Sequence, residues 1–134
     1  MIFGIGTDLI EIERIRAAYL RFGERFAERI LGERELERYH LRRLRSDERG
    51  IKYLATRFAA KEAVSKALGL GMRRPMSWRA VEIVNDASGR PVAFIGSAEL
   101  RKFTERHRLT LHVSVSDERA FATAYAIAEA EGGS

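Results

Sequence analysis

The spacing of apolar positions along the chain predicts a strand at the start and helices after it. Residues 2–12 are rich in β-branched side chains and alternate in part, which is typical of a strand. Residues 14–45 follow a helical pattern that Gly23 and Gly32 interrupt, and a longer helical pattern runs from 48 to 70. In that longer segment alanines recur every four residues, which would let another element approach the helix closely.

The second part of the chain changes to short strands with one helix between them. We expect strands over 80–84, 92–95, 109–115 and 121–128, and a helix over 97–106 with Ser97 as its N-cap. Turn-forming segments join the strands, NDASGRP in the first pair and SDER in the last. Because regular βαβ units are absent, the pattern predicts an α+β fold with an antiparallel sheet packed with helices, in a single domain over residues 1–134.

Composition narrows the classes of protein and of site. Apolar residues make up 46% of the chain and charged residues 32%, as in a folded domain with a charged surface. No apolar run approaches the roughly 18–20 residues of a membrane span, and the N-terminus lacks the features of a signal peptide, so we expect a cytoplasmic protein with no membrane partner. Cysteine is absent, which excludes zinc–cysteine sites and thiol nucleophiles. With only 3 histidines an all-histidine metal site is disfavoured too, so any metal would be bound mainly by carboxylates, which favours a hard cation such as magnesium.

Positive charge is concentrated in the first part of the chain. The net charge is +5, and residues 1–80 carry 18 basic against 11 acidic residues. Such a surplus predicts an anionic partner, which at this point could be nucleic acid, a phosphorylated small molecule or an acidic protein. Arginines recur at Arg14, Arg16, Arg21, Arg25 and Arg29 with glutamates between them. This series is either a salt-bridged surface or a docking face for an acidic protein.

Asp8 is the first candidate for chemistry. On a strand it would share the apolar face with isoleucines, beside the space left by Gly4 and Gly6. A carboxylate in that position needs a metal, a cation or several N–H donors. The alternative is that the strand ends near Thr7 and that Asp8 caps a turn.

The second candidate is the segment RFAAKEAVSKALG, residues 57–69. Helical geometry places Arg57, Lys61 and Ser65 on one stripe, and Phe58, Glu62 and Lys66 on the adjoining one. These cations suit the oxygens of a polyphosphate, and one carboxylate suits a magnesium ion. The alternative is a solvated surface with a Glu62–Lys66 pair. Among the histidines, His112 lies within a predicted strand, where a core position is the commoner outcome.

Four motifs together resemble one family, the holo-acyl carrier protein synthases, which are the short type of 4′-phosphopantetheinyl transferase. They are GIGTDLIEI at 4–12, RFAAKEAVSKALG at 57–69, NDASGRP at 85–91 and HVSVSDE at 112–118. They occur in the order and spacing of the family, and the resemblance covers essentially the whole chain. It implies transfer of the phosphopantetheine arm of coenzyme A to a serine of apo-acyl carrier protein, in support of fatty acid biosynthesis, with release of adenosine 3′,5′-bisphosphate.

The resemblance also implies roles for individual residues. Asp8 and Glu62 match the family's magnesium ligands, and Lys66 matches its phosphate-contacting lysine, so these three form the expected catalytic set. Glu62 is the candidate general base, acting directly or through a water. The expected coenzyme A contacts are Arg57, Lys61, Ser65, Gly89, Arg90 and Pro91. Family members dock the acidic carrier on the first helix, which predicts contacts from Arg14, Arg21 and Arg25.

Two further properties follow from the resemblance alone. The family is typically a homotrimer with active sites between subunits, so Asp8 and Glu62 should act beside residues of a neighbouring chain. Many members have a histidine where this chain has Asp117, which is here either an additional ligand in the metal shell or a turn former, and we expect a turn former. The alternatives are the same chemistry on a polyketide or peptide synthetase carrier, or a basic nucleic-acid-binding module. The second is disfavoured because no nucleic-acid-binding motif is present and glutamates interleave with the arginines.

Overall fold

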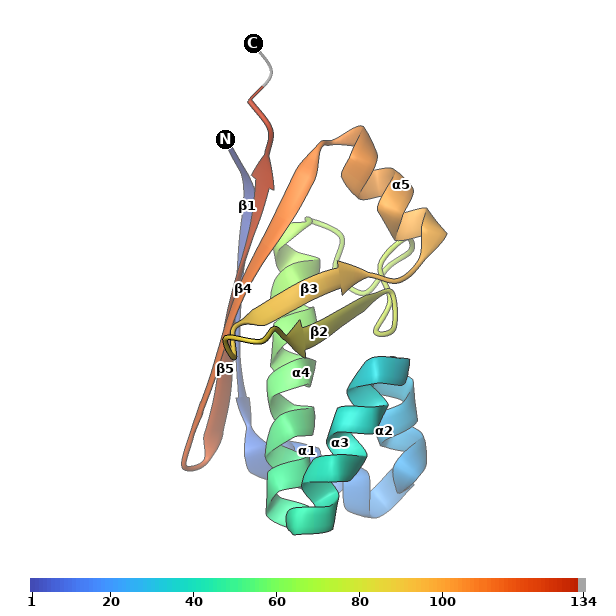
Figure 1. Ribbon diagram of the computed structural model, residues 1–134, viewed down its shortest axis with the longest axis vertical. Helices are drawn as coiled ribbons and strands as arrows, with labels where there is room; N and C mark the ends of the chain where they lie inside the picture. The colour runs from blue at the N-terminus through green and yellow to red at the C-terminus, as the bar shows by residue number, and fades with distance from the viewer. Residues whose placement is uncertain (133–134) are drawn as a thin grey trace.

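The computed structural model describes residues 1–132, and Figure 1 shows how its elements are arranged. The strands are β1 (Ile2–Glu11), β2 (Val81–Asn85), β3 (Pro91–Ile95), β4 (Leu109–Glu118) and β5 (Phe121–Ala130). The helices are α1 (Ile12–Phe22), α2 (Glu24–Ile30), α3 (Glu33–Arg45), α4 (Asp47–Ala67) and α5 (Ala98–Arg106). Within these residues no helix combines the length and the apolar character that crossing a membrane requires. The α+β fold with antiparallel pairing is confirmed.

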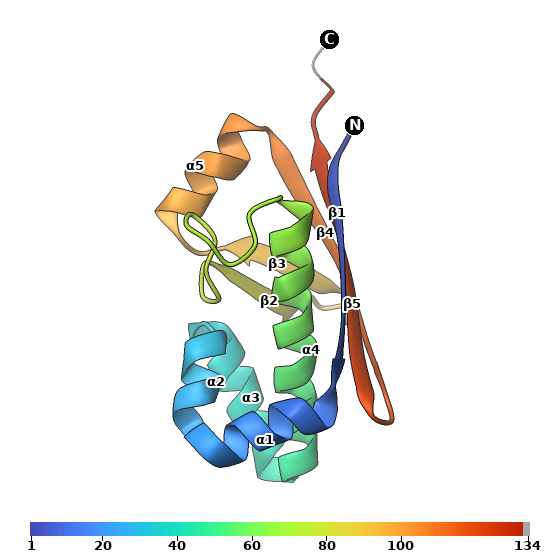
Figure 2. The ribbon, with the colours of Figure 1, turned by 180° about the vertical axis from the view of Figure 1, so that it is seen from behind.

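The sheet topology leaves β1 and β4 as the two edges of the main sheet. The strand order is β1-β5-β4, with antiparallel pairing throughout, and β2 pairs with β3 as a separate antiparallel hairpin. Figures 1 and 2, which view the molecule from opposite sides, show α4 lying along one face of this sheet. The helices α1, α2 and α3 gather beside one end of α4, and α5 lies near the other.

Small residues allow β1 and α4 to approach each other closely. A Cβ atom on Gly4 would lie 1.9 Å from the carbonyl oxygen of Ala67, and one on Gly6 would lie 1.8 Å from that of Ala63. The middle strand of the sheet presents alanines to the same helix, and all of them are fully buried: Ala122, Ala124, Ala126 and Ala128. The alanine row of the long helix was predicted to admit a close neighbour, and that neighbour is the sheet.

The outer face of the sheet is apolar and exposed. Side chains alternate across a strand, so the residues between the buried positions of β1 and β5 point away from α4. Ile5 is 66% exposed, Leu9 65% and Tyr125 57%. In Figures 1 and 2 the helices lie on the opposite side of this sheet. Within residues 1–132 the helices therefore leave this face uncovered.

The last hairpin is longer than the sequence pattern predicted. β4 extends to Glu118 and β5 begins at Phe121, so most of the segment SDER belongs to a strand. The reversal falls instead at Arg119 and Ala120, where Arg119 adopts φ 53°. A two-residue connection with a positive φ matches the right-handed twist of paired strands. The prediction for Ser97 is confirmed, because its hydroxyl accepts a hydrogen bond from the Leu100 N–H at 3.1 Å.

Candidate active site

Asp8 lies within β1 on the face that packs against α4. Its neighbours on that face, Gly6 and Ile10, are buried, and its own side chain is 18% exposed. The strand continues through Glu11, so the alternative that Asp8 caps a turn is wrong. The Thr123 hydroxyl on β5 donates to the Asp8 carbonyl at 3.1 Å. This hydrogen bond, together with the pairing of β1 with β5, fixes the backbone that carries the carboxylate.

Glu62 reaches the same region from α4. It is partly buried, and this burial raises the pKa of its carboxyl above the ordinary value. The negative charge of Asp8 raises the pKa of Glu62 further, while the charge of Lys66 lowers it. Burial, the main cause, and the charge of Asp8 together outweigh Lys66, so the charged form of Glu62 is disfavoured relative to a carboxylate in water.

Lys66 lies beside Asp8 one helical turn beyond Glu62. Its ammonium donates to the Thr7 carbonyl at 2.8 Å and lies 3.3 Å from Asp8 Oδ1. The lysine side chain remains 52% exposed. The ion pair of Lys66 is thus made to Asp8 across the helix–strand contact. The expected alternative, a Glu62–Lys66 pair on a solvated helix face, does not account for this arrangement.

The donor set fits a divalent cation of the hard kind. Two carboxylates from different elements lie near enough for the charge of one to act on the other, and no third histidine, cysteine, aspartate or glutamate joins them within residues 1–132. Magnesium keeps several waters and takes one or two protein carboxylates together with phosphate oxygens. A cation held between the two groups would offset the repulsion between the charges of Asp8 and Glu62. Asp8 and Glu62 are the residues that would hold it.

A second, strongly basic site lies at the opposite edge of the sheet. We call it the cationic pocket; it has a volume of about 340 Å³, and its positive lining residues are Arg42, Arg49, Lys52 and Arg57. Gly89 and Pro91 from the turn between β2 and β3 and Asp117 from β4 complete part of its wall. Four cations around one hollow form a site for phosphate oxygens.

Arg57 is the buried member of the cationic pocket. Its guanidinium donates to the Ile83 carbonyl and to Asn85 Oδ1, both at 3.0 Å, and lies 4.2 Å from the centre of the Tyr53 ring. Burial is the main influence on this group and lowers the pKa of Arg57 from its ordinary value. Arg57 therefore supplies positive charge to the pocket from a buried and fixed position.

Three cations of this pocket were not predicted from the sequence, although a local signal exists for Arg49 and Lys52. Arg49, Lys52, Thr56 and Arg57 recur at the spacing of one helix stripe, together with Tyr53. The predicted phosphate-binding segment, residues 57–69, does not include the two helical turns that carry these residues. Arg42, on α3, has no such local signal. Its place in the pocket follows from the packing of α3 against α4.

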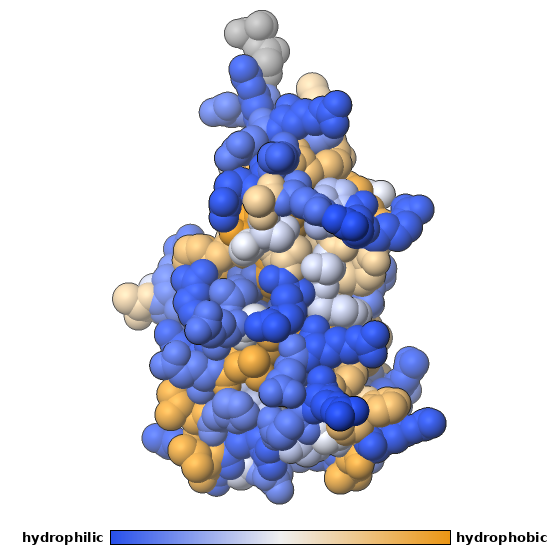
Figure 3. All heavy atoms as spheres, turned by 90° about the vertical axis from the view of Figure 1, so that its right-hand side faces the viewer, coloured by the Kyte–Doolittle hydropathy of each residue, from blue (hydrophilic) through white to orange (hydrophobic). Residues whose placement is uncertain are grey.

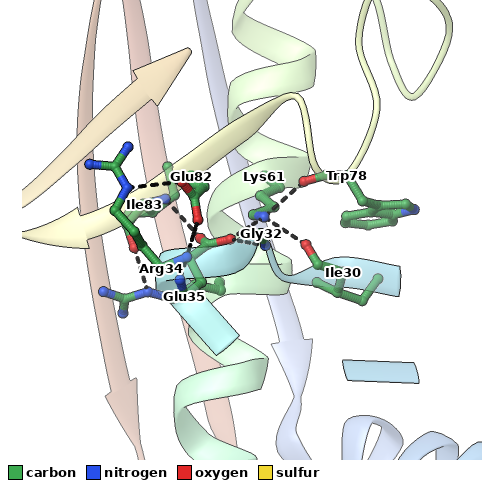
Figure 4. A network of polar contacts seen from close by, with 9 residues as sticks. Ile30, Gly32, Arg34, Glu35, Lys61, Trp78, Glu82 and Ile83 are labelled. Carbon is green, nitrogen blue, oxygen red and sulfur yellow. Dashed lines mark hydrogen bonds and ion pairs between the residues drawn. The ribbon is translucent and has the colours of Figure 1, made fainter. Parts of the chain in front are cut away.

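Two expected coenzyme A contacts lie in the interior. The Lys61 side chain is fully buried, and its ammonium donates to the Ile30 carbonyl, to Glu35 and to the Trp78 carbonyl (Figure 4). Ser65 is also fully buried, and its hydroxyl donates to the Glu62 carbonyl at 2.7 Å. The helix stripe that was predicted to face phosphates packs inward at these two positions, so neither is available to a ligand in this structure.

Two other predictions need correction. Asp117 lies in β4 and lines the cationic pocket, so it is not a turn former. His112 is not a core residue: its side chain is 53% exposed, and its Nε2 lies 2.9 Å from Glu129 Oε1. Arg90 lies exposed in the turn between β2 and β3, next to Gly89 and Pro91. Asp117 therefore places a carboxylate among the arginines of the cationic pocket.

A third feature is an apolar groove between α2, α4 and the segment that precedes β2. The groove has a volume of about 410 Å³ and is lined by Phe22, Arg25, Phe26, Arg29, Ile30, Phe58 and Trp78. Phe58 lies one helical turn before Glu62 on the same stripe of α4. Arg14, Arg21 and Arg25 are all exposed on α1 and α2. Figure 3, which shows the helical side of the molecule, has apolar patches between densely packed hydrophilic side chains.

Comparison with known proteins shows which family has this sequence and this fold. Residues 4–130 match the family model described as the 4′-phosphopantetheinyl transferase superfamily. The chain is 54% identical over 129 residues to a holo-[acyl-carrier-protein] synthase of Herminiimonas arsenicoxydans, covering 96% of this chain and 98% of that protein. Its fold resembles the crystal structure of the Neisseria meningitidis holo-[acyl-carrier-protein] synthase, with TM-score 0.87 and 40% identity over 96% of this chain and 99% of the other.

A second similar structure was solved with a bound ligand. A holo-(acyl-carrier-protein) synthase from Bacillus anthracis, solved in complex with CoA (3′,5′-ADP), matches with TM-score 0.79 and 34% identity, covering 98% of this chain and 99% of that one. These likenesses extend over nearly the whole chain, and they confirm the resemblance that the four motifs indicated. The chain belongs to the 4′-phosphopantetheinyl transferase superfamily, among its holo-acyl carrier protein synthases.

Proposed function

We propose that this chain, acting as one domain, transfers the 4′-phosphopantetheine group of coenzyme A to a serine hydroxyl of apo-acyl carrier protein. The products are holo-acyl carrier protein and adenosine 3′,5′-bisphosphate. The observation that carries this proposal is the meeting of Asp8, Glu62 and Lys66 at the contact of β1 with α4. The reaction needs a nucleophile held in line with one phosphorus, removal of its proton and neutralisation of the leaving group.

Each of these residues has a distinct task. Lys66, held by the Thr7 carbonyl, stabilises the negative charge that develops on the phosphate oxygens. Glu62 accepts the serine proton, directly or through one water. Asp8 and Glu62 would hold a magnesium ion, whose chemistry is to neutralise the pyrophosphate oxygens.

The nucleotide half of coenzyme A would occupy the cationic pocket. Arg42, Arg49, Lys52 and Arg57 supply positive charge for its phosphates, and Gly89, with φ 90°, leaves the backbone of the turn open to close approach. Arg90 and Pro91 flank that turn. This pocket lies at the β4 edge of the sheet, whereas Asp8 lies on β1, the other edge.

Separation of the two sites supports a catalytic centre that two copies of the chain share. Glu62 and Arg57 lie about 140° apart around α4, because five residues advance a helix by that angle. The β1 edge of one copy and the β4 edge of the next would complete one centre. The apolar outer face with Ile5, Leu9 and Tyr125 would be the surface that associates. A closed ring of three copies is the expected assembly.

The acidic carrier would dock beside Glu62 on the apolar groove and its basic rim. Phe58 forms part of the groove one turn before Glu62, so a protein seated there presents its serine at the carboxylates. Arg14, Arg21 and Arg25 supply the complementary charge for an acidic surface. Cytoplasmic fatty acid synthesis is the setting that this carrier implies.

Mass spectrometry of the carrier tests the reaction. Purified protein is mixed with coenzyme A, magnesium and apo-acyl carrier protein, and a gain of one phosphopantetheine group is expected. Chelation of the metal should abolish the gain, and added magnesium should restore it. Modification of polyketide or peptide synthetase carriers in place of this one would retain the chemistry and change the pathway. Absence of modification on every carrier by folded protein would refute the proposal.

Complementation tests the shared centre. One variant carries Glu62→Gln, and the other carries Arg49→Glu with Lys52→Glu, so each is defective in a different half of the site. Mixed after reversible dissociation, the two should recover part of the wild-type rate, because some centres combine two intact halves. Light scattering reports the number of copies. No recovery by a stably mixed oligomer would mean that each chain holds a whole centre.

A further inference from the structure

The reaction proposed above leaves one buried ionic pair without a role, that of Lys61 and Glu35. Both side chains are fully buried (Figure 4). The Lys61 ammonium donates to Glu35 Oε1 and to the Ile30 carbonyl at 2.6 Å, and to the Trp78 carbonyl at 2.8 Å. An ammonium has three protons, so all of them are used. The lysine has no donor left for a ligand.

Glu35 is satisfied in the same way. Its Oε1 accepts from the Gly32 N–H at 2.8 Å in addition to Lys61, and its Oε2 accepts from the Ile83 N–H at 2.7 Å. The carboxylate therefore ties the start of α3 to β2, while the lysine belongs to α4. Such pairs are costly to bury, and replacing them by apolar residues is often neutral for stability. Stability alone does not explain this pair.

The two carbonyl groups that Lys61 holds belong to two residues of the apolar groove that come from different segments of the chain. Ile30 ends α2, and Trp78 lies in the segment between α4 and β2; both residues line the groove. Phe58 lies between them and comes from α4, the helix of Lys61, three residues before it. The Trp78 ring stacks on the Phe58 ring, with centroids 4.7 Å apart and 27° between the planes. One ammonium thus connects all three parts of the groove.

We propose that Lys61, with Glu35, is a positioning residue that fixes the spacing between α2 and the Trp78 segment and thereby the affinity for the carrier protein. This inference rests on the proposed docking of the carrier in the groove. Groups that are already ordered lose less conformational freedom on binding, so a fixed groove binds more tightly than one whose sides move. Lys61 acts on the carrier through Ile30 and Trp78, and it touches neither substrate.

The test compares two variants that differ in the carbonyl contacts. Glu35→Gln removes the ion pair but leaves the Lys61 ammonium its two carbonyls, so the KM for carrier should stay within about twofold of wild type. Lys61→Met combined with Glu35→Gln removes both charges and the carbonyl contacts together. For this double variant we expect the KM for carrier to rise about tenfold, with the KM for coenzyme A and kcat within about twofold.

Trp78 reports the groove without any turnover. It is the only tryptophan of the chain, so its fluorescence comes from one place. In the double variant we expect red-shifted emission and stronger acrylamide quenching, because the ring is no longer held on Phe58. Arg34→Met is the matched control. It breaks the neighbouring pair of Arg34 with Glu82 at 3.1 Å, which touches no groove residue, and should change neither readout.

A measurement on the wild-type protein covers the case in which the double variant does not fold. A lysine ammonium with three buried acceptors exchanges its protons slowly and gives its own ¹H–¹⁵N resonance. That resonance should shift when apo-carrier is added and stay in place with coenzyme A alone. A shift with coenzyme A but none with carrier overturns the inference.

The outcomes also separate this inference from the proposed function. If wild-type protein modifies no carrier, the proposed function itself is wrong. If wild-type protein modifies the carrier, and the folded double variant keeps both the wild-type KM for carrier and the Trp78 emission, then the positioning role alone is wrong.

Discussion

Lys61 and Glu62 are neighbours in the sequence, yet they belong to two ionic clusters with opposite properties. The cluster of Lys61 is fully buried, and every donor and acceptor of its two charged groups has a partner. The cluster of Glu62 is partly open, and the single ammonium of Lys66 does not neutralise its two carboxylates. The contrast teaches that charge alone does not distinguish the two kinds of cluster. In the cluster that supports the fold every donor and acceptor has a partner, whereas the cluster that we propose to bind a ligand has charge left to pair.

Helix geometry explains how adjacent residues come to differ so much. Successive side chains point about 100° apart around a helix, so Lys61 faces α3 and β2 while Glu62 faces the β1 edge of the sheet. Figure 4 shows the first of these directions, with the Lys61 ammonium among the carbonyl groups. The motif that joins the two residues therefore combines a buried structural position with one that we propose to be catalytic.

Glu62→Gln is the sharpest way to test the open cluster. The change keeps the shape of the side chain but removes its charge, and we expect the rate of carrier modification to fall by about 10²–10³-fold. The thermal midpoint should stay the same or rise, because burial and Asp8 both disfavour the charge at Glu62. Turnover and thermal unfolding are measured side by side, with Glu105→Gln at an exposed position of α5 as control. A fall in thermal midpoint with full activity would reverse the assignment.

Lys61→Met should produce the opposite result at the saturated cluster. It leaves the Glu35 carboxylate buried without its cation, which costs about 3–5 kcal/mol, and urea denaturation measures the loss. The matched control is Lys66→Met, whose side chain is half exposed; its free energy of unfolding should change by less than about 1 kcal/mol while activity falls. Equal stability of the two variants would remove the distinction between the clusters.

Gly6→Ala tests the contact that brings Asp8 to Glu62. The new Cβ would lie 1.8 Å from the Ala63 carbonyl oxygen, so β1 and α4 must separate. We expect a loss of about 3 kcal/mol in the free energy of unfolding and a lower rate, since the two carboxylates move apart. Thr7→Ala, next along β1 on the exposed face, is the control and should leave stability nearly unchanged. Tolerance of alanine at Gly6 would show that close approach is not required.

The sequence predicted the elements well because local signals determine them. Gly23 ends α1 and Gly32 precedes the start of α3, and the alanine row marks the helix that meets the sheet. It failed at Lys61 and Ser65 because a charged stripe on a helix has the same pattern whether it faces solvent or a second polar layer. Only the packing of α3 and β2 on that stripe decides, and this contact joins segments far apart in the chain. His112 shows the converse, a strand position whose partner strand leaves it exposed.

Reversing the charge of Arg14 or Arg21 is the smallest expected effect, and it sharpens the comparison by adding a third kind of charge. These arginines lie exposed on α1, so they belong to neither cluster and stability should not change. With Arg14→Glu we expect the association rate with the acidic carrier to fall by about threefold to tenfold at low salt, because rim charges steer the encounter. Stopped-flow binding at low ionic strength and at about 0.5 M salt measures the association rate, and screening should remove most of the difference.

Arg101→Glu on α5, away from the groove, is the control for Arg14→Glu. An effect of equal size at both salt concentrations would indicate a direct contact in the complex, and an unchanged association rate would remove Arg14 from the docking surface.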